Sequence, residues 1–314
     1  MNKIRIGTRG SKLALKQASL VQEALQQADG LIETEVIVVH TKGDKVQDRP
    51  LSEIGDKGVF ASELEQALLN GQIDIAVHSA KDLPMALAEG LTIAAVLPRG
   101  DVRDVLVIPE GGRMPLPAGS EQEAANVPER NFVIGSGSRR RQQQAGQIWK
   151  NVVCENIRGN VDTRLKKLKD GSGDGTIYDG IILAKAGLDR LGIGLEREEG
   201  LKFYPLPPEQ FLPAACQGII AVEAMQDSDV AMLCREITDA ETELCFRVER
   251  EALARLAADC SESVASWCRR EEDSLVLDVM YAGKRQQLVS AAEVREGLAM
   301  AQEAAKIVIG IESS

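Results

Sequence analysis

The residues with the clearest capacity for chemistry are Lys81 and Asp82, which lie in the stretch IDIAVHSAKDLP over residues 73–84. The apolar side chains at its start predict a buried strand, and polar side chains follow directly from His78 onward. In an open α/β sheet, ligands bind beyond the carboxyl ends of the strands. An ammonium group and a carboxylate at such an end are therefore placed for chemistry. On this stretch alone, a solvated loop with a local ion pair explains the residues equally well.

Arginines recur at two further turns that we predict to join a strand to a helix. These are GSGSRRRQQQ over residues 135–144 and IRGNVDTRL over residues 157–165. Between residues 135 and 170 there are nine Lys and Arg against three Asp and Glu, a local charge of +6. Planar guanidinium groups at such turns can bind carboxylates through two parallel hydrogen bonds. A solvated helix face is the alternative, and it is what we expect for the lysines at 166–169.

Another turn of this kind, at residues 8–11, places Arg9 and Ser11 between a predicted strand and a predicted helix. Ser11 is a suitable N-cap for that helix. The free N–H groups at a helix start form a natural anion site. The alternative is a capping loop with an exposed arginine.

The elements that must position these turns predict an α/β fold with two doubly wound lobes and a smaller C-terminal α+β domain. We expect a first domain of residues 1–98 with 200–220, a second of 99–199 and a third of 221–314. In the first domain, a βαβαβ pattern predicts a parallel sheet with helices on both faces. Residues 200–213 contain four prolines and are expected to be a linker, followed by a strand over 218–224 that returns to the first domain.

Composition excludes several classes of protein. The chain has 314 residues and a net charge of −11, which argues against a general nucleic-acid binder. It contains no apolar run long enough to span a membrane and no signal peptide, so we expect a cytoplasmic protein. Two histidines exclude a multi-histidine zinc site, and no metal is expected. The six cysteines form no CxxC pair and are expected to be free thiols.

Five motifs together resemble the porphobilinogen deaminase (hydroxymethylbilane synthase) family. They are HSAKDLP, GSGSRRRQ, IRGNVDTRL, ILAKAGLDRLG and LPAACQGIIAVE, supported by IRIGTRGSKLAL and GDKGVFASELE, and the match runs from residue 3 to about 260. The resemblance implies an enzyme that joins four porphobilinogen molecules head to tail into hydroxymethylbilane and releases ammonia at each step. It also implies a monomer whose first two domains resemble two-lobed anion-binding proteins, with the active cleft between them.

The resemblance further implies one covalent dipyrromethane cofactor per chain, held by a thioether to a cysteine of the third domain. VEREALARLAADC places Cys260 at that position. The family has two glycines before this cysteine and a proline three residues after it, whereas this chain has Ala258, Asp259 and Ser263. Asp259 and Glu262 flank the thiol, and negative charge disfavours the thiolate that must form the thioether.

The resemblance also assigns roles to residues of the turns. Asp82 is the catalytic acid/base and stabilises the cationic azafulvene, while it also faces the cofactor. The other expected cofactor-binding residues are Lys81, Ser138, Arg140, Arg141 and Arg158. The expected substrate-binding residues are Arg9, Ser11, Phe60, Arg158, Arg190 and Gln217. The charged loop over 42–59 carries Glu53 and Asp56 where the family often has lysine and glycine.

Two other functions fit the same architecture. A two-lobed protein that captures a small anion without chemistry would need neither Asp82 nor Cys260. An inactive homologue is the other alternative, because of the departures around Cys260. A pyrrole colour reaction on the denatured protein and a turnover assay with porphobilinogen separate these alternatives.

Overall fold

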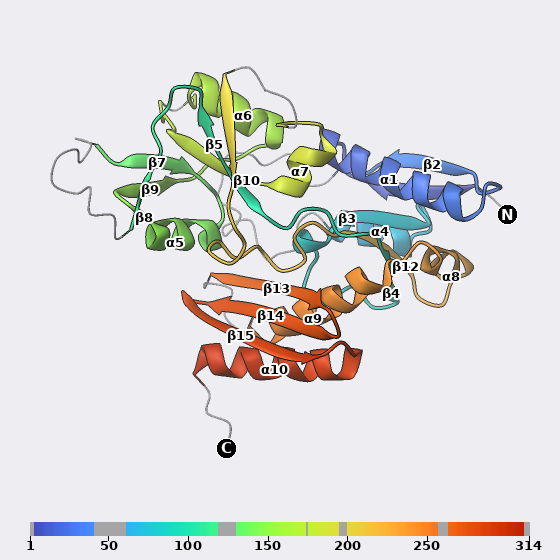
Figure 1. Cartoon of the computed structure of the whole chain (residues 1–314). Coiled ribbons are helices and arrows are strands. Elements are labelled where there is room, and N and C mark those ends of the chain that lie inside the picture. Colours follow the sequence, from blue (N-terminus) through green and yellow to red (C-terminus); the bar gives the residue numbers. More distant parts are fainter. Residues whose placement is uncertain are drawn as a thin grey trace.

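A computed structural model describes residues 3–40, 61–118, 130–173, 175–194, 200–256 and 263–310. Phe60, Cys260 and the loop over 42–59 lie outside these residues. Figure 1 shows three parts: two upper lobes side by side, and a smaller C-terminal part below them. In the described part of the chain, no helix has both the length and the apolar character needed to cross a membrane.

The first lobe is built on a five-stranded sheet with the order β2-β1-β3-β12-β4. Its strands are β1 (Ile4–Thr8), β2 (Thr34–Val38), β3 (Ile75–Ser79), β4 (Leu91–Val96) and β12 (Ile220–Met225). Successive side chains of β3 point to opposite faces, so Ile75 and Val77 pack under α1 (Lys12–Ala28), while Ala76 packs under α4 (Ser62–Leu69). Helices therefore cover both faces, as the sequence predicts.

The second lobe has a sheet with the order β11-β5-β10-β7-β9. Its strands are β5 (Asp104–Pro109), β7 (Phe132–Gly135), β9 (Val152–Glu155), β10 (Gly180–Ala184) and β11 (Leu201–Pro205); β6 (Leu116–Pro117) and β8 (Trp149–Lys150) form a separate small pair. The helices are α5 (Arg139–Ile148), α6 (Val161–Asp170) and α7 (Lys185–Arg190). Alternating side chains of β10 place Ile181 in the core under α6 and Ile182 in the core under α5.

The C-terminal part is an antiparallel sheet of β13 (Val264–Glu271), β14 (Ser274–Tyr281) and β15 (Lys284–Ala291). The helices α9 (Ala240–Leu256) and α10 (Val294–Ile309) cover one face and share an apolar core with it. The helices pack closely at Gly297, where a Cβ atom would lie 2.7 Å from Val248 Cγ2. On the other face, Trp267 and Met280 pack against Leu212. This is the α+β domain that the sequence predicts.

Four details differ from the sequence predictions. The first sheet is not wholly parallel, because β12 lies between β3 and β4 and runs antiparallel to both. Residues 201–205, expected to be a linker, form β11 at the edge of the second sheet, where Pro205 is tolerated at the strand end. The helix α8 (Asp229–Arg235), expected in the third domain, packs into the core of the first lobe. The strand β13 was not predicted, because both of its faces are covered and polar alternation is lost. The division into three folding domains stays a prediction.

One buried ion pair joins the C-terminal part to the crossing between the two lobes. Arg99 lies just beyond β4, where the chain leaves the first lobe, and its Nη1 lies 2.6 Å from Glu249 Oε1 on α9. Glu249 is fully buried and also accepts the backbone N–H groups of Cys216 and Cys268. Arg99 Nε donates to the carbonyl oxygen of Gln217. The pair thus connects the crossing between the lobes, the turn before β12, α9 and β13.

We predict that Glu249→Gln lowers the free energy of unfolding by roughly 3 kcal/mol, because it leaves the Arg99 guanidinium buried without its counter-charge. Glu35→Gln is the control, since the Lys3–Glu35 pair is exposed and its loss is expected to cost less than about 1 kcal/mol. The midpoint of urea unfolding measures both. Equal midpoints for the two variants would contradict the central role of the buried pair.

Candidate active site

Lys81 and Asp82 lie at the end of β3, in the position that the sequence predicts. The chain leaves β3 at Ser79 and forms one turn of 3-10 helix, η1 (Ala80–Asp82). Ala80 is buried and its N–H donates to the carbonyl oxygen of Ile219, while Leu83 is buried on the other side of the turn. These two apolar anchors leave Lys81 partly buried and Asp82 exposed to solvent. The turn therefore presents a carboxylate outward on a fixed backbone.

The arginines of GSGSRRRQQQ converge on a carboxylate that the sequence analysis missed. Asp104, the first residue of β5, is fully buried. Its Oδ2 accepts from Arg140 Nη2 at 2.7 Å, and its Oδ1 accepts from Arg141 Nη2 at 2.7 Å. Arg140 also donates to the carbonyl oxygen of Leu212, and Arg141 to that of Ile182. Both guanidinium groups are thus buried and tied to protein acceptors, so neither lies open in a cleft.

A chain of polar contacts connects this buried cluster to Lys81. Gln217 Nε2 donates to Asp104 Oδ1 at 3.0 Å, and Lys81 Nζ donates to Gln217 Oε1 at 3.4 Å. Burial alone would raise the pKa of Asp104, but Arg140 and Arg141 outweigh it and hold that pKa well below its usual range. Burial lowers the pKa of Lys81 to about 8; Asp82 opposes this effect and Arg141 adds to it. The expected site residues Lys81, Gln217, Arg140 and Arg141 therefore belong to one electrostatic network.

Arg164 is a second residue of the network that was not predicted as a site residue. It lies in α6, within the IRGNVDTRL motif, and its Nε donates to the carbonyl oxygen of Gly159 at 2.7 Å. Burial lowers its pKa to about 10; the charges of Arg141 and Arg158 add to that effect and Asp82 opposes it. The structure therefore brings Arg164 near both Asp82 and Arg158. The sequence signal for Arg164 was its presence in the same motif as Arg158, one helical turn beyond Asn160.

The turn at residues 8–11 faces the second lobe. Ser11 caps α1, and its Oγ accepts from the N–H of Ala14 at 3.2 Å. The next residue, Lys12, pairs across the lobes with Asp162 in the first turn of α6, with Nζ and Oδ2 2.6 Å apart. Arg9 is partly buried beside this turn. The ion pair thus places the Arg9–Ser11 turn opposite the turn that carries Arg158.

Two other expected site residues have local structural contacts. Ser138 caps α5, and its Oγ accepts from the N–H of Arg141 at 3.4 Å. Arg190 Nη2 donates to the carbonyl oxygen of Gly218 at 2.6 Å, beside Gly100. Burial lowers the pKa of Arg190 to about 10. These contacts place Arg190 where the two crossings between the lobes meet, and they do not join it to the network around Asp82.

The network carries more positive than negative charge. Among the described residues, the groups that interact with Lys81 or Arg164 are the cations Arg140, Arg141 and Arg158 and the carboxylates Asp82 and Asp104. Five cations against two anions leave a surplus of three positive charges. Mutual repulsion contributes to the lowered pKa of Lys81 and of Arg164, so an added anion would stabilise the charged forms. The donor set therefore fits a ligand with several carboxylates, such as an acid-substituted dipyrromethane.

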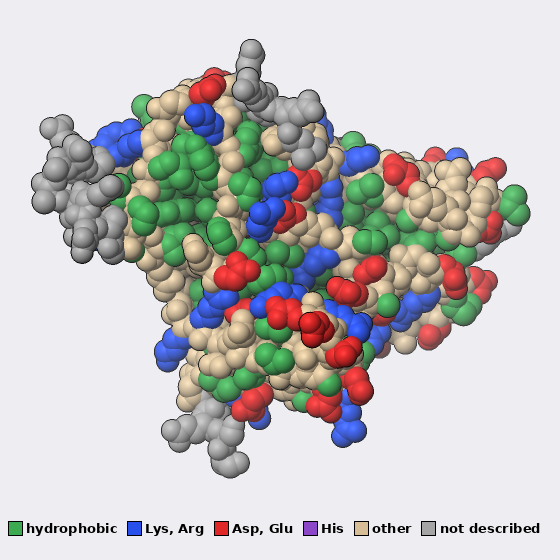
Figure 2. Space-filling view, viewed as in Figure 1, with side chains coloured by type: hydrophobic (Ala, Val, Ile, Leu, Met, Phe, Trp, Pro, Cys, Tyr) green, Lys and Arg blue, Asp and Glu red, His purple; other side chains and the backbone are tan. Residues whose placement is uncertain are grey.

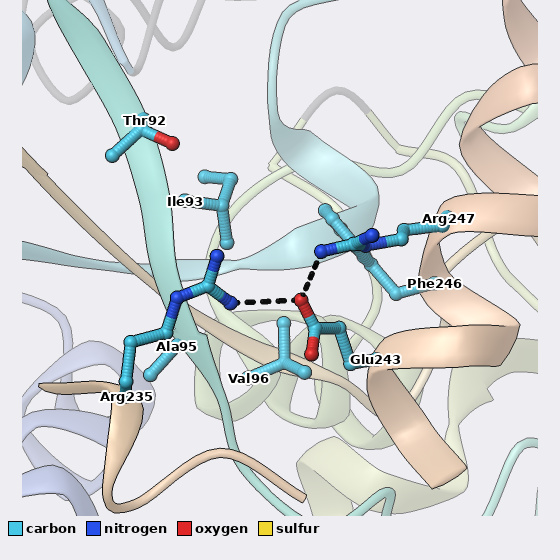
Figure 3. Close-up of a pocket in the computed structure, with 8 residues that line it drawn as sticks. All are labelled: Thr92, Ile93, Ala95, Val96, Arg235, Glu243, Phe246 and Arg247. Atoms are coloured by element: carbon cyan, nitrogen blue, oxygen red, sulfur yellow. Dashed lines mark hydrogen bonds and ion pairs between the residues drawn. The ribbon is translucent and has the colours of Figure 1, made fainter. Parts of the chain in front are cut away.

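Charged side chains of both signs are interleaved where the C-terminal part meets the two lobes (Figure 2). A pocket of about 190 Å³ lies in that region, between β4 and α9. Arg235 and Arg247 approach Glu243 there from two sides, and both donate to its Oε1 (Figure 3). Their charges are therefore directed at this carboxylate. The pocket shares no residue with the network around Asp82, so we do not assign it as the active site.

Comparison with known proteins finds one family over most of the chain. The family model "Porphobilinogen deaminase, dipyromethane cofactor binding domain" matches residues 4–232. A relative named porphobilinogen deaminase from Roseiflexus sp. is 39% identical over 286 residues, which are 90% of this chain and 87% of the relative. Relatives of the same name from Acetivibrio thermocellus and Streptococcus sanguinis are 39% and 36% identical, over 90% and 98% of this chain and 88% and 95% of their own lengths.

We predict that Lys81 loses its positive charge as the pH rises through about 8, because its pKa lies below the ordinary 10.5. The lysines of the Cys260→Ala variant are methylated with 13C-formaldehyde, and their NMR signals are followed as the pH is raised. The signal that disappears when Lys81→Arg is added belongs to Lys81. Lys12 is the internal control, since its hydrogen bond to Asp162 raises its pKa. A Lys81 signal that titrates together with that of Lys12 would contradict the prediction.

Proposed function

Because the chain belongs to the porphobilinogen deaminase family, we propose that the network around Asp82 is the active site in which porphobilinogen molecules are joined. The family chemistry condenses four of them head to tail into hydroxymethylbilane and releases ammonia at each step. It is primed on a covalently bound dipyrromethane, which would offer the attachment point for the first porphobilinogen without becoming part of the product.

The surplus positive charge is the observation that carries this proposal. Each porphobilinogen carries an acetate and a propionate, so the growing chain adds two carboxylates with every unit. The protein has a net charge of −11, and only a concentrated set of cations can hold such a chain against that field. Lys81, Arg158 and Arg164 are the cations of the network that donate no described hydrogen bond to a carboxylate. We assign them to the acid groups of the cofactor and substrate.

The buried arginines have a different task in this proposal. Arg140 and Arg141 are paired with Asp104, so they fix the backbone of α5 and contribute a long-range positive potential. Ser138 begins the same helix and directs its free N–H groups toward an anion. Arg9 and Ser11 extend the cationic wall from the first lobe. Gln217 holds Lys81 in position through its amide oxygen.

Asp82 is the proton-transfer group in this proposal. It is exposed on a turn whose neighbours Ala80 and Leu83 are buried, so its carboxylate is held in a defined place. One carboxyl group facing the pyrrole N–H groups can donate its proton as ammonia leaves. The carboxylate that results can stabilise the developing positive charge and then accept the proton lost after the new bond forms. Lys81 beside it anchors carboxylates and does not act as a nucleophile.

Cys260 is the proposed attachment residue for the cofactor, and three of the other five cysteines support this assignment. Thioether formation needs a thiolate. Burial raises the pKa of Cys154 to about 11 and that of Cys234 to about 12, and it raises the pKa of Cys216 still further above its usual range. These three thiols are therefore poor nucleophiles at neutral pH. We also propose that the protein acts as a monomer in the cytoplasm. We further propose that it binds no nucleic acid, because its net charge is strongly negative.

We predict that the purified protein is heavier than its sequence by two pyrrole units and that Cys260→Ala removes this added mass. Cys154→Ala is the control and retains the addition, because this half-buried thiol has a pKa raised to about 11 and stays protonated at neutral pH. Intact-mass spectrometry measures all three proteins. An active enzyme with an unmodified Cys260 would refute the assignment.

We predict that Asp82→Asn lowers the rate of bilane formation by roughly 100-fold or more, because an amide cannot exchange the proton. Its thermal unfolding should match that of the unmodified enzyme, since Asp82 is exposed. Glu89→Gln serves as the control, because Glu89 is also exposed and lies in the same lobe. Near-normal turnover by Asp82→Asn would remove Asp82 from the mechanism.

A further inference from the structure

We propose that Gln143 and Ser263 form a positioning pair that docks the start of β13 on α5 and thereby places the cofactor-bearing cysteine relative to the anion-binding turns. This inference rests on the proposed role of Cys260 and concerns how that residue is brought to the site. Neither residue belongs to the network around Asp82.

The pair joins the second lobe to the C-terminal part. Ser263 is buried, with 6% of its surface exposed, and its Oγ donates a hydrogen bond to Gln143 Oε1 on α5. The carbonyl oxygen of Ser263 accepts the N–H of Ala282 at 3.1 Å, which extends the β13–β14 ladder by one residue. Ser263 is therefore fixed on two sides, by the sheet through its backbone and by α5 through its side chain.

A second contact between the same elements supports this docking. Gly283 occupies the turn between β14 and β15, with φ +84°. A Cβ atom there would lie 2.8 Å from the Nε2 atoms of both Gln143 and Gln147. Two glutamine side chains of α5 thus pack on the backbone of the hairpin. Figure 1 shows α5 directly above the ends of the strands β13–β15.

The same helix carries residues of the proposed active site. Ser138 caps α5, Arg141 lies in its first turn, and Gln143 follows two residues after Arg141. Cys260 precedes Ser263 by three residues, so the length of the chain limits the distance between their Cα atoms to about 11 Å. On the other side, Leu256 ends α9 and is 1% exposed in the core of the C-terminal part. On one side of Cys260 the chain is therefore held in the core of the C-terminal part at Leu256, and on the other side it is held on α5 at Ser263.

The pair belongs to this sequence in particular. Ser263 stands where the family motif has proline, and proline offers no hydroxyl group to an acceptor. A chain with proline there restrains the segment through its own backbone torsion. In this chain, a hydrogen bond to Gln143 supplies the restraint. The departures around Cys260 therefore do not by themselves indicate an inactive homologue.

The test measures how fast the cofactor is attached. The full-length protein is produced in cells that make no porphobilinogen, then supplied with porphobilinogen, and its intact mass is followed over time. We expect Ser263→Ala and Gln143→Ala each to slow attachment by about five-fold, the effect of one lost hydrogen bond. The double variant should be no slower than the slower single variant, because both changes remove the same contact.

Two further variants separate positioning from stability. Gln143→Glu keeps an oxygen acceptor for the Ser263 hydroxyl and should attach the cofactor at close to the normal rate. Gly146→Ala adds a methyl group on α5 where nothing lies within 4 Å, so it should leave attachment unchanged. Thermal unfolding is recorded for every variant, and attachment is measured well below the lowest midpoint.

Normal attachment rates in both alanine variants would overturn the proposal. A double variant whose rate is lowered by the product of the two single fold-changes would also overturn it. A lower unfolding midpoint with normal attachment would reduce the pair to a stabilising contact and would also overturn it. If the protein without substitutions gains no mass, no cofactor is attached to Cys260. The proposed function then fails before the pair is tested.

Discussion

The buried carboxylate of Asp104 is the constraint on which the rest of the site depends. Two guanidinium groups under the protein surface would be very costly without a counter-charge, and Asp104 supplies one oxygen to each of them. Its position at the first residue of β5 fixes where α5 begins relative to the second sheet. Through Gln217 the same carboxylate orients Lys81, which belongs to the first lobe. One ionised group thus aligns the cationic turns of both lobes.

This arrangement separates two kinds of positive charge. Arg140 and Arg141 are neutralised in part by Asp104 and have little freedom to move toward a ligand. Lys81 and Arg164 keep their charge at an energetic cost, which is visible in pKa values lowered to about 8 and about 10. A ligand with carboxylates relieves that cost, so part of its binding energy comes from repulsion already present in the protein. A strongly acidic protein can therefore bind an acidic chain through a small and crowded set of cations.

The parts of this structure that local sequence dictates could be predicted, and the parts that distant pairing dictates could not. The strand-to-turn transition at residues 75–82 follows from an apolar run and the polar residues after it. Asp104 was missed because its partners lie 36 and 37 residues further along the chain. The antiparallel insertion of β12 was missed for the same reason. Arg164 was overlooked among neighbouring lysines, because sequence alone does not say which face of α6 meets Asp82.

The position of α5 connects the acid-binding turns with the C-terminal part. Ser138 caps it, its first turn contains Arg141, and its middle contacts Ser263 and the β14–β15 turn. Arg99 and Glu249 hold the C-terminal part to the crossing between the lobes at a second place. Two separated attachments fix both the distance and the orientation of that part, which a single contact cannot do. Leu256 and Ser263, the described residues on either side of Cys260, are therefore held in fixed positions relative to α5.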